Sequence, residues 1–211
     1  MNRQSLTIGI AGGSGSGKTT LVRFLTQTFP QDITVISYDN YYRAHDELSY
    51  EERCKLNYDT PEAFDTELLC SHIEKLRVGE AIPCPVYDFT VHNRSDETVW
   101  IEPKPVLVIE GILLLAQPEL YHQLDIRLFL DGDSDLRLIR RIRRDMRDRG
   151  RSLQSVIEQY TDTVKPMYER YVEPSRANAD IIIPKGGKNR VAQELLSSRI
   201  REFLTKSNQS R

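Results

Sequence analysis

A glycine-rich segment near the start of the chain, GIAGGSGSGKTT at residues 9–20, restricts the fold more than any other feature. It follows a short apolar run and precedes a helical pattern, and Gly12, Gly17, Lys18 and Thr19 fit the spacing G-x-x-x-x-G-K-[ST]. Glycines let successive N–H groups point inward, and the following helix adds its positive N-terminal end. The segment therefore predicts a phosphate-binding loop (P-loop) for a nucleoside triphosphate, in which Lys18 is a mobile cation and Thr19 a hydroxyl on the Mg²⁺ side. The alternative, a flexible turn, requires neither side chain.

The rest of the chain alternates short apolar runs with helical patterns. The runs, which have the composition of strands buried on both faces, are Leu6–Ala11, Ile33–Ser37, Val106–Glu110, Ile126–Leu130 and Ile181–Ile183. The helical patterns are Lys18–Phe29, Thr66–Val78, Ser134–Arg147, Leu153–Lys165 and Asn189–Leu204. This alternation predicts an α/β fold of the P-loop NTPase type, with a parallel sheet of about five strands flanked by helices.

The segment IPCPVYDFTVHNRSDETVWIE, from Ile82 to Glu102, breaks this alternation. Its two alternating stretches flank a polar turn at residues 92–96, which predicts an antiparallel hairpin inserted at about residues 81–103. Tyr87 and Phe89 fall on one strand face by the two-residue period, where they could stack a flat base while His92 hydrogen-bonds its edge. Ordinary packing of the hairpin against the core explains the same pattern, and the residues by themselves favour packing.

Size and composition favour a single domain over residues 1–211. With 29 Lys and Arg against 31 Asp and Glu, the net charge of −2 argues against nucleic acid or an anionic membrane as a partner. Cys54, Cys70 and Cys84 form no disulfide or zinc pattern, and no segment approaches the roughly 20 apolar residues of a membrane span. We therefore expect a cytoplasmic protein whose tail, at about residues 205–211, is frayed.

Two acidic residues follow predicted strands at the edge where open α/β sheets bind ligands. Asp39 could accept a hydroxyl proton as an acceptor attacks the γ-phosphate, and a turn or helix-capping role is an equal alternative. Glu110 is similar to the acidic residue that holds Mg²⁺ through water in P-loop enzymes. The alternative for Glu110 is a carboxylate that faces solvent at a strand end.

The segment from Leu136 to Arg151 holds eight arginines among 16 residues. At 100° per residue, Leu138, Ile139, Ile142 and Met146 gather on one side of a helix, and Arg137, Arg141 and Arg144 gather on the other. A solvated charged face is the usual explanation of such a run. Because phosphoryl transfer requires mobile cations to neutralise developing charge, we expect instead a lid with functional arginines at about residues 144–165.

Seven blocks of sequence between Leu6 and Leu204 together resemble the uridine kinase family, also called uridine-cytidine kinases. The blocks are GGSGSGKT, YDNYYR, NYDTPEAFD, PVYDFTVHNR, VIEGILLL, RRIRRDMRDRGRS and ADIIIPKGGKN, in that order. The resemblance implies a kinase that uses ATP or GTP to phosphorylate the 5′-hydroxyl of uridine and cytidine, giving UMP and CMP in pyrimidine salvage.

The resemblance also implies roles for individual residues. Asp39 would be the general base, and Lys18, Arg144 and Arg149 would complete the catalytic set. The implied nucleotide-binding residues are Gly12, Gly13, Ser14, Gly15, Ser16, Gly17, Lys18, Thr19, Thr20, Arg149 and Arg151. The implied nucleoside-binding residues are Asp39, Tyr42, Asp59, Tyr87, Phe89, His92, Arg141, Arg144 and Gln159. Of these, Asp59 and Arg141 would hold the ribose 2′- and 3′-hydroxyls, and His92 would read the pyrimidine edge. Thr19 and Glu110 would hold Mg²⁺, with Asp39 partly through water.

Assembly and regulation are implied in the same way. Members of the family form homotetramers and are inhibited by UTP and CTP, so the resemblance implies both properties here. Two other functions stay open. Another P-loop kinase, acting on pantothenate or ribulose 5-phosphate, would explain the glycine loop and the basic lid but not the aromatic hairpin. A nucleotide-sensing regulatory protein would bind a triphosphate but would have no need of a second pocket.

Overall fold

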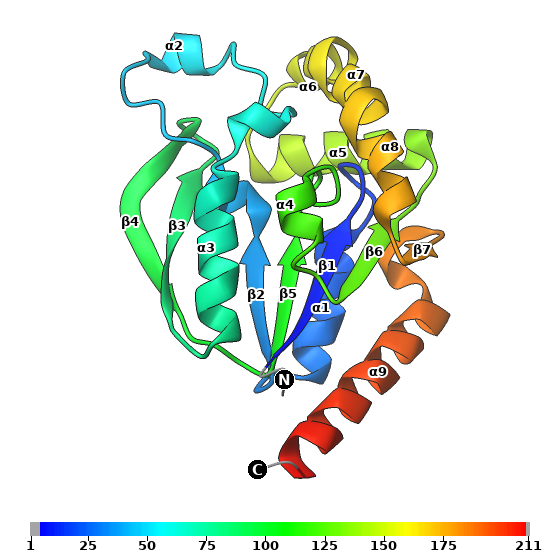
Figure 1. Cartoon of the computed structure of the whole chain (residues 1–211). Helices are drawn as coiled ribbons and strands as arrows, with labels where there is room; N and C mark the ends of the chain where they lie inside the picture. Colours follow the sequence, from blue (N-terminus) through cyan, green and yellow to red (C-terminus); the bar gives the residue numbers. More distant parts are fainter. Residues whose placement is uncertain (1–4, 210–211) are drawn as a thin grey trace.

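The central element of the computed structural model, which describes residues 5–209, is a parallel sheet (Figure 1). Within this range its strands lie in the order β2-β5-β1-β6-β7, and every neighbouring pair is parallel. The strands are β1 (Leu6–Ala11), β2 (Ile33–Ser37), β5 (Val106–Glu110), β6 (Ile126–Leu130) and β7 (Ile181–Ile183). These are the bounds that the apolar runs predict, so the expected five-stranded parallel sheet is confirmed.

Helices cover both faces of the sheet (Figure 1). The α-helices of the described residues are α1 (Lys18–Thr28), α2 (Tyr50–Arg53), α3 (Thr66–Arg77), α4 (Pro118–Tyr121), α5 (Ser134–Asp148), α6 (Leu153–Gln159), α7 (Lys165–Met167), α8 (Glu173–Ser175) and α9 (Arg190–Gln209). On one face α3 and α4 pack against the strands, and on the other α1 and α9 do so. The flanking helices of the predicted α/β fold are therefore confirmed.

Alternate residues of the central strands form two separate cores. In β5, Val108 packs with Leu25 of α1, whereas its neighbour Ile109 packs on the opposite face with Ile73 of α3, and all four side chains are fully buried. Full burial of an aliphatic side chain of this size stabilises the fold by about 1.5–3 kcal/mol. Two packed faces therefore make the sheet a rigid base for the loops at its carboxyl edge.

The edge strand β7 departs from the expected burial. It pairs only with β6 among the described strands, and Ile181 is 47% exposed while Ile183 is buried. The prediction that this run is buried on both faces is therefore wrong, because a three-residue strand at the end of the sheet has no helix over its first two side chains.

The inserted hairpin is present, but its turn lies earlier than expected. β3 (Ile82–Asp88) and β4 (Asn93–Ile101) pair antiparallel in a separate two-stranded sheet. The turn occupies residues 89–92 rather than 92–96, because His92 takes a left-handed φ of 52° and Asn93 already pairs with Asp88. Phe89 thus lies just past the end of β3, although its ring still packs edge-on against Tyr87 at 5.1 Å.

The helical segment that begins at Leu153 continues to Ser175, beyond the end expected at Lys165. Two π-helical turns, at Tyr160–Val164 and Tyr168–Val172, interrupt it shortly before Pro166 and Pro174. A proline lacks an N–H, and its ring clashes with the carbonyl four residues earlier in an α-helix. In both cases that carbonyl belongs to a wider π turn, so the chain stays helical through residues that normally end a helix.

The last helix also runs further than predicted. Residues 205–209, which we expected to be frayed, belong to α9, and residues 210–211 lie outside the described range. The ion pair between Lys206 and Glu202, one helical turn apart at 2.5 Å, supports this turn. A search of residues 5–209 finds no helix with the length and apolar character needed to cross a membrane.

Candidate active site

The candidate site lies at the carboxyl edge of the parallel sheet, where the loops after β1, β2 and β5 meet. A cavity of about 480 Å³ opens there, and its lining includes all nine residues of the expected nucleoside-binding set. It also includes Ser14, Lys18, Thr19, Arg149 and Arg151 of the expected nucleotide-binding set. The others, Gly12, Gly13, Gly15, Ser16, Gly17 and Thr20, form the loop and the start of α1 but do not line the cavity. A larger hollow of about 690 Å³ beside α3 and α4 contains none of these residues.

The P-loop curls around the end of the Lys18 side chain. Gly17, the residue before α1, has a φ of 100°, a left-handed value that residues other than glycine rarely adopt. The Lys18 ammonium donates to the carbonyl oxygens of Gly12 at 2.9 Å and Gly13 at 3.4 Å. Burial lowers the pKa of Lys18, and the nearby carboxylates of Glu110 and Asp39 act in the opposite direction. The lysine is thus already directed into the loop, beside both acidic residues.

Asp39 and Glu110 approach each other because β2 and β5 are adjacent. Ser37, the last residue of β2, pairs with Glu110 in the sheet register, and its hydroxyl donates to Glu110 Oε1 at 3.3 Å. Asp39 follows in the 3₁₀ turn Tyr38–Tyr41. Burial has the largest effect on the pKa of Glu110 and raises it. The positive charge of Lys18 lowers this pKa, and the negative charge of Asp39 raises it. Two carboxylates in mutual repulsion at the cavity wall are a favourable place for a cation.

The expected magnesium set is chemically suited to that ion but incomplete by itself. Among the described residues no group of three or more His, Cys, Asp or Glu could hold a metal. Asp39, Glu110 and the hydroxyl of Thr19 do line the same cavity. Mg²⁺ prefers oxygen ligands and usually keeps several waters while binding one or two carboxylates and substrate phosphates. A partial set of two carboxylates and one hydroxyl therefore fits this ion.

Aromatic rings form one wall of the cavity. The ring centroids of Tyr42 and Tyr87 are 4.9 Å apart, and Tyr58 stacks on His92 at 5.7 Å. Burial, together with the positive charges of Arg151 and Arg149, lowers the pKa of His92 and so favours its neutral ring. A neutral imidazole has one nitrogen that donates and one that accepts, which suits the polar edge of a base.

Sequence reasoning missed Tyr58, although it stands directly before Asp59 in the block NYDTPEAFD. Its hydroxyl donates to the carbonyl of His92 at 3.2 Å, a contact across 34 residues that no local pattern indicates. Other lining residues that the sequence did not single out are Tyr50, Cys54, Thr90, Ile112, Gly150 and Ser155. The only available signal for Tyr58 was an aromatic side chain beside a predicted ribose ligand.

Asp59 and Arg141 both line the cavity, and no hydrogen bond or ion pair is found between them among the described residues. The Arg141 guanidinium donates to Ser14 Oγ at 3.1 Å and to Gln159 Oε1 at 2.8 Å. Burial raises the pKa of Asp59, and the positive charge of Arg141 opposes this shift. Gln159 Oε1 accepts from both Arg141 and Arg151.

The basic side of α5 faces inward. Arg137 and Arg141 are each 7% exposed. On the expected apolar side Ile139 and Met146 are exposed, whereas Leu138 and Ile142 are half-buried. The alternative of a solvated charged face is therefore wrong for these two arginines. Arg144 and Arg149 also line the cavity, and the Arg149 guanidinium lies 4.3 Å over the Phe89 ring. The expected arginine-rich lid lies against the P-loop and the hairpin turn.

Comparisons with known proteins match most of the chain. A model of the phosphoribulokinase/uridine kinase family matches residues 7–192. The chain is 49% identical over 205 residues to a uridine kinase of Halalkalibacterium halodurans, covering 97% of each protein. It is 47% identical over 208 residues to a uridine kinase of Streptococcus agalactiae, covering 98% of this chain and all of the relative.

The fold also matches a solved structure of low sequence similarity. Phosphoribulokinase from Rhodobacter spheroides superposes with a TM-score of 0.62 at 16% identity, covering 86% of this chain and 70% of that one. At this identity the likeness concerns the fold alone. The family model and the curated relatives, each matching most of the chain, show that it belongs to the phosphoribulokinase/uridine kinase family.

Proposed function

We propose that the chain phosphorylates the 5′-hydroxyl of uridine and cytidine with ATP or GTP, giving UMP and CMP in pyrimidine salvage. The observation that carries the proposal is the joint lining of one cavity by the P-loop lysine, two acidic residues and an aromatic wall. A triphosphate on the loop and a flat base against the rings would bring their reacting ends to Asp39. The curated relatives, which are named uridine kinases, support this acceptor.

In the proposed reaction the Asp39 carboxylate accepts the proton of the 5′-hydroxyl while that oxygen attacks the γ-phosphorus. The bond from the γ-phosphorus to the bridging oxygen breaks, and the nucleoside diphosphate leaves with the bonding electrons. Lys18, Arg144 and Arg149 stabilise the negative charge that spreads over the transferred group. Mg²⁺, held by Thr19 and Glu110 with Asp39 partly through water, would neutralise charge on the donor phosphates.

The acceptor pocket explains the proposed selectivity. Tyr87 and Phe89 offer faces and edges for stacking, and neutral His92 can donate to or accept from either pyrimidine. In the proposal Arg141 exchanges its bond to Gln159 for one to the ribose diol, beside Asp59. A nucleoside without the 2′-hydroxyl would leave these buried groups unpaired, which costs about 1–3 kcal/mol.

A panel of acceptors with Mg-ATP and Mg-GTP tests the proposal. We expect UMP and CMP as products, and a kcat/KM for 2′-deoxyuridine roughly 10- to 100-fold below that for uridine. Pantothenate, ribulose 5-phosphate and adenosine belong in the same panel. Phosphorylation of one of these without phosphorylation of uridine or cytidine would overturn the assignment. Nucleotide binding with no acceptor turned over would instead favour a regulatory protein.

The same proposal includes a cytoplasmic homotetramer that UTP and CTP inhibit. The free thiols of Cys54, Cys70 and Cys84 fit a reducing compartment. Large apolar side chains, among them Trp100 at 68% exposed, lie on the surface, where a subunit interface could cover them. UTP and CTP carry a pyrimidine and a triphosphate in one molecule, so either could contact the aromatic wall and the P-loop together.

A further inference from the structure

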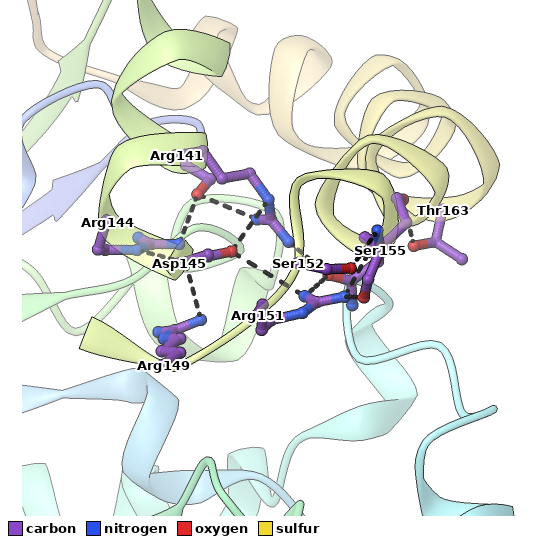
Figure 2. Close-up of polar contacts among 10 residues, drawn as sticks. Arg141, Arg144, Asp145, Arg149, Arg151, Ser152, Ser155 and Thr163 are labelled. Atoms are coloured by element: carbon purple, nitrogen blue, oxygen red, sulfur yellow. Dashed lines mark hydrogen bonds and ion pairs between the residues drawn. The ribbon is translucent and has the colours of Figure 1, made fainter. Parts of the chain in front are cut away.

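The buried carboxylate of Asp145 lies among four arginines, Arg141, Arg144, Arg149 and Arg151 (Figure 2). Asp145 is in the last turn of α5 and is 0% exposed. Its oxygens are 2.8 Å from Arg144 Nε, 3.6 Å from Arg141 Nε, 3.6 Å from Arg149 Nη1 and 4.0 Å from Arg151 Nη1. We call these four guanidiniums with Asp145 the arginine cluster. Among residues 5–209, each of these four arginines forms its ion pair with Asp145.

The cluster keeps an excess of positive charge. A buried carboxylate is costly to desolvate unless it is well paired, and here four cations surround it. Its Oδ2 nonetheless accepts no hydrogen bond, and Arg141 Nε donates none, among the described residues. Oδ1 accepts from Arg144 Nε–H at 2.8 Å, whereas the contacts with Arg141, Arg149 and Arg151 are ion pairs that hold these arginines close without saturating them. Guanidinium groups in this condition retain the capacity to bind phosphate oxygens.

The arginine cluster connects the separate parts of the site. Ser14 of the P-loop accepts from Arg141 at 3.1 Å and from Arg144 at 3.4 Å. Arg151 donates to Ser155 Oγ of α6 at 2.8 Å, and Arg149 lies over the hairpin ring of Phe89. The backbone carbonyl of Asp145 also accepts from the N–H groups of Arg149 and Arg151. Side chain and main chain of one residue therefore both determine where the lid arginines lie.

The geometry points to Asp145 as a positioning residue, which fixes the four guanidiniums of the arginine cluster around the cavity, against the P-loop, the hairpin turn and α6, before the donor triphosphate arrives. It contacts no reacting atom in the reaction proposed above, on which this inference rests, and acts through the arginines. Cations fixed in advance require no reorganisation as charge develops on the transferred phosphoryl group. Asp145 would thus contribute to kcat although its own negative charge does not favour a bound anion.

Asp145→Asn tests this inference, because it keeps the shape and removes the charge. We expect kcat to fall by about 10²-fold, as for a misplacement of catalytic groups by about 1 Å. Affinity for ATP and for inorganic tripolyphosphate, measured by calorimetry, should not fall, because a negative charge has been removed beside an anion site. If Asp145 only stabilised the fold, Asp145→Asn would lower the folded fraction, and turnover and nucleotide binding would decrease together.

Asp148→Asn is the matched control. It lies one turn further along the same helix and makes the same change of charge, but it is exposed and pairs with Arg147 on the surface. We expect its kcat and its nucleotide affinity to equal those of the wild type. The inference is overturned if Asp145→Asn retains kcat within about twofold of the wild type, or if its affinity falls in proportion to kcat.

A measurement without a variant at position 145 keeps the inference testable if Asp145→Asn does not fold. In the nucleotide-free wild type the Arg144 Nε–H should exchange with solvent at least tenfold more slowly than that of exposed Arg147, as observed by NMR. Arg144→Lys and Arg147→Lys assign the two signals. Equal exchange rates would overturn the inference. Nucleotide binding and hydrogen exchange are measured without an acceptor, and kcat is measured with whichever acceptor the panel identifies. The role of Asp145 can therefore be tested even if uridine is not the acceptor.

Discussion

Asp39 is the residue on which the proposed reaction depends most directly. It stands second in the 3₁₀ turn Tyr38–Tyr41, between two tyrosines that are fully buried. The Tyr38 hydroxyl is 2.7 Å from Thr66 Oγ1, and the Tyr41 hydroxyl is 2.9 Å from His72 Nδ1. These contacts fix the backbone on both sides of the carboxylate, which itself faces the cavity.

Asp39→Asn should lower kcat by about 10²- to 10⁴-fold, because an amide cannot accept the hydroxyl proton. Affinity for the donor nucleotide should persist, since Lys18 and the P-loop are unchanged. Steady-state kinetics and calorimetry provide the two measurements. Asp96→Asn, a change of the same charge at an exposed position of β4, is the control and should behave as the wild type. Retained turnover in Asp39→Asn would rule out the general-base role.

At the scale of elements, the turn that carries Asp39 is tied to α3 through His72. Burial lowers the pKa of His72, with a smaller contribution of the same sign from Lys75. The folded state therefore favours neutral His72, whereas the unfolded chain takes up a proton near pH 6.5. The free energy of unfolding is then highest above pH 6.5 and decreases as pH falls below it, by up to about 1.4 kcal/mol per pH unit.

This linkage predicts that His72→Gln loses less stability than the wild type between pH 7 and pH 5.5. Glutamine can still hydrogen-bond Tyr41 but does not titrate. Urea unfolding at several pH values measures the slope, and His122→Gln, at an exposed position, is the control. His92 contributes in the same sense and Glu110 in the opposite sense, so the informative quantity is the difference between variant and wild type. Equal slopes for all three proteins would contradict the prediction.

At the scale of the whole molecule, the proposed tetramer makes a direct prediction. Sedimentation velocity at micromolar concentration should give a species of four times the 24.4 kDa chain mass. UTP or CTP should inhibit competitively with ATP, because the triphosphate of the inhibitor and that of the donor would need the same P-loop. A species of single-chain mass, or inhibition that ATP does not relieve, would contradict this part of the proposal.

The sheet and the meeting of its loops could be predicted because they depend on local signals. Short apolar runs revealed the strands, and parallel pairing then placed Asp39 and Glu110 at one edge. Features that depend on distant contacts could not be predicted. Tyr58 gains its position by stacking on His92, and the turn of the hairpin depends on the left-handed backbone of that residue rather than on polarity.

The prediction was wrong about where one helix ends, and it was right about the arginines without a signal for their depth of burial. Pro166 and Pro174 normally end a helix, and the π turns that accommodate them have no clear sequence signature. In α5 the period identified the two sides correctly, but periodicity cannot tell which side is buried when the inner partner is a polar cavity. No sequence pattern indicated that Asp145 is buried, because an acidic residue among arginines usually lies in solvent.

The burial of arginines in α5, and the exposure of some of its apolar residues, also determine which positions of this helix tolerate substitution. Replacing the buried Arg141 removes a cation and leaves Ser14 and Gln159 without its hydrogen bonds. A polar residue in place of exposed Leu136 or Ile139 costs a single chain little. Over many generations the buried Arg137 and Arg141 would therefore change least, and the exposed Leu136 and Ile139 would vary unless a second surface covers them.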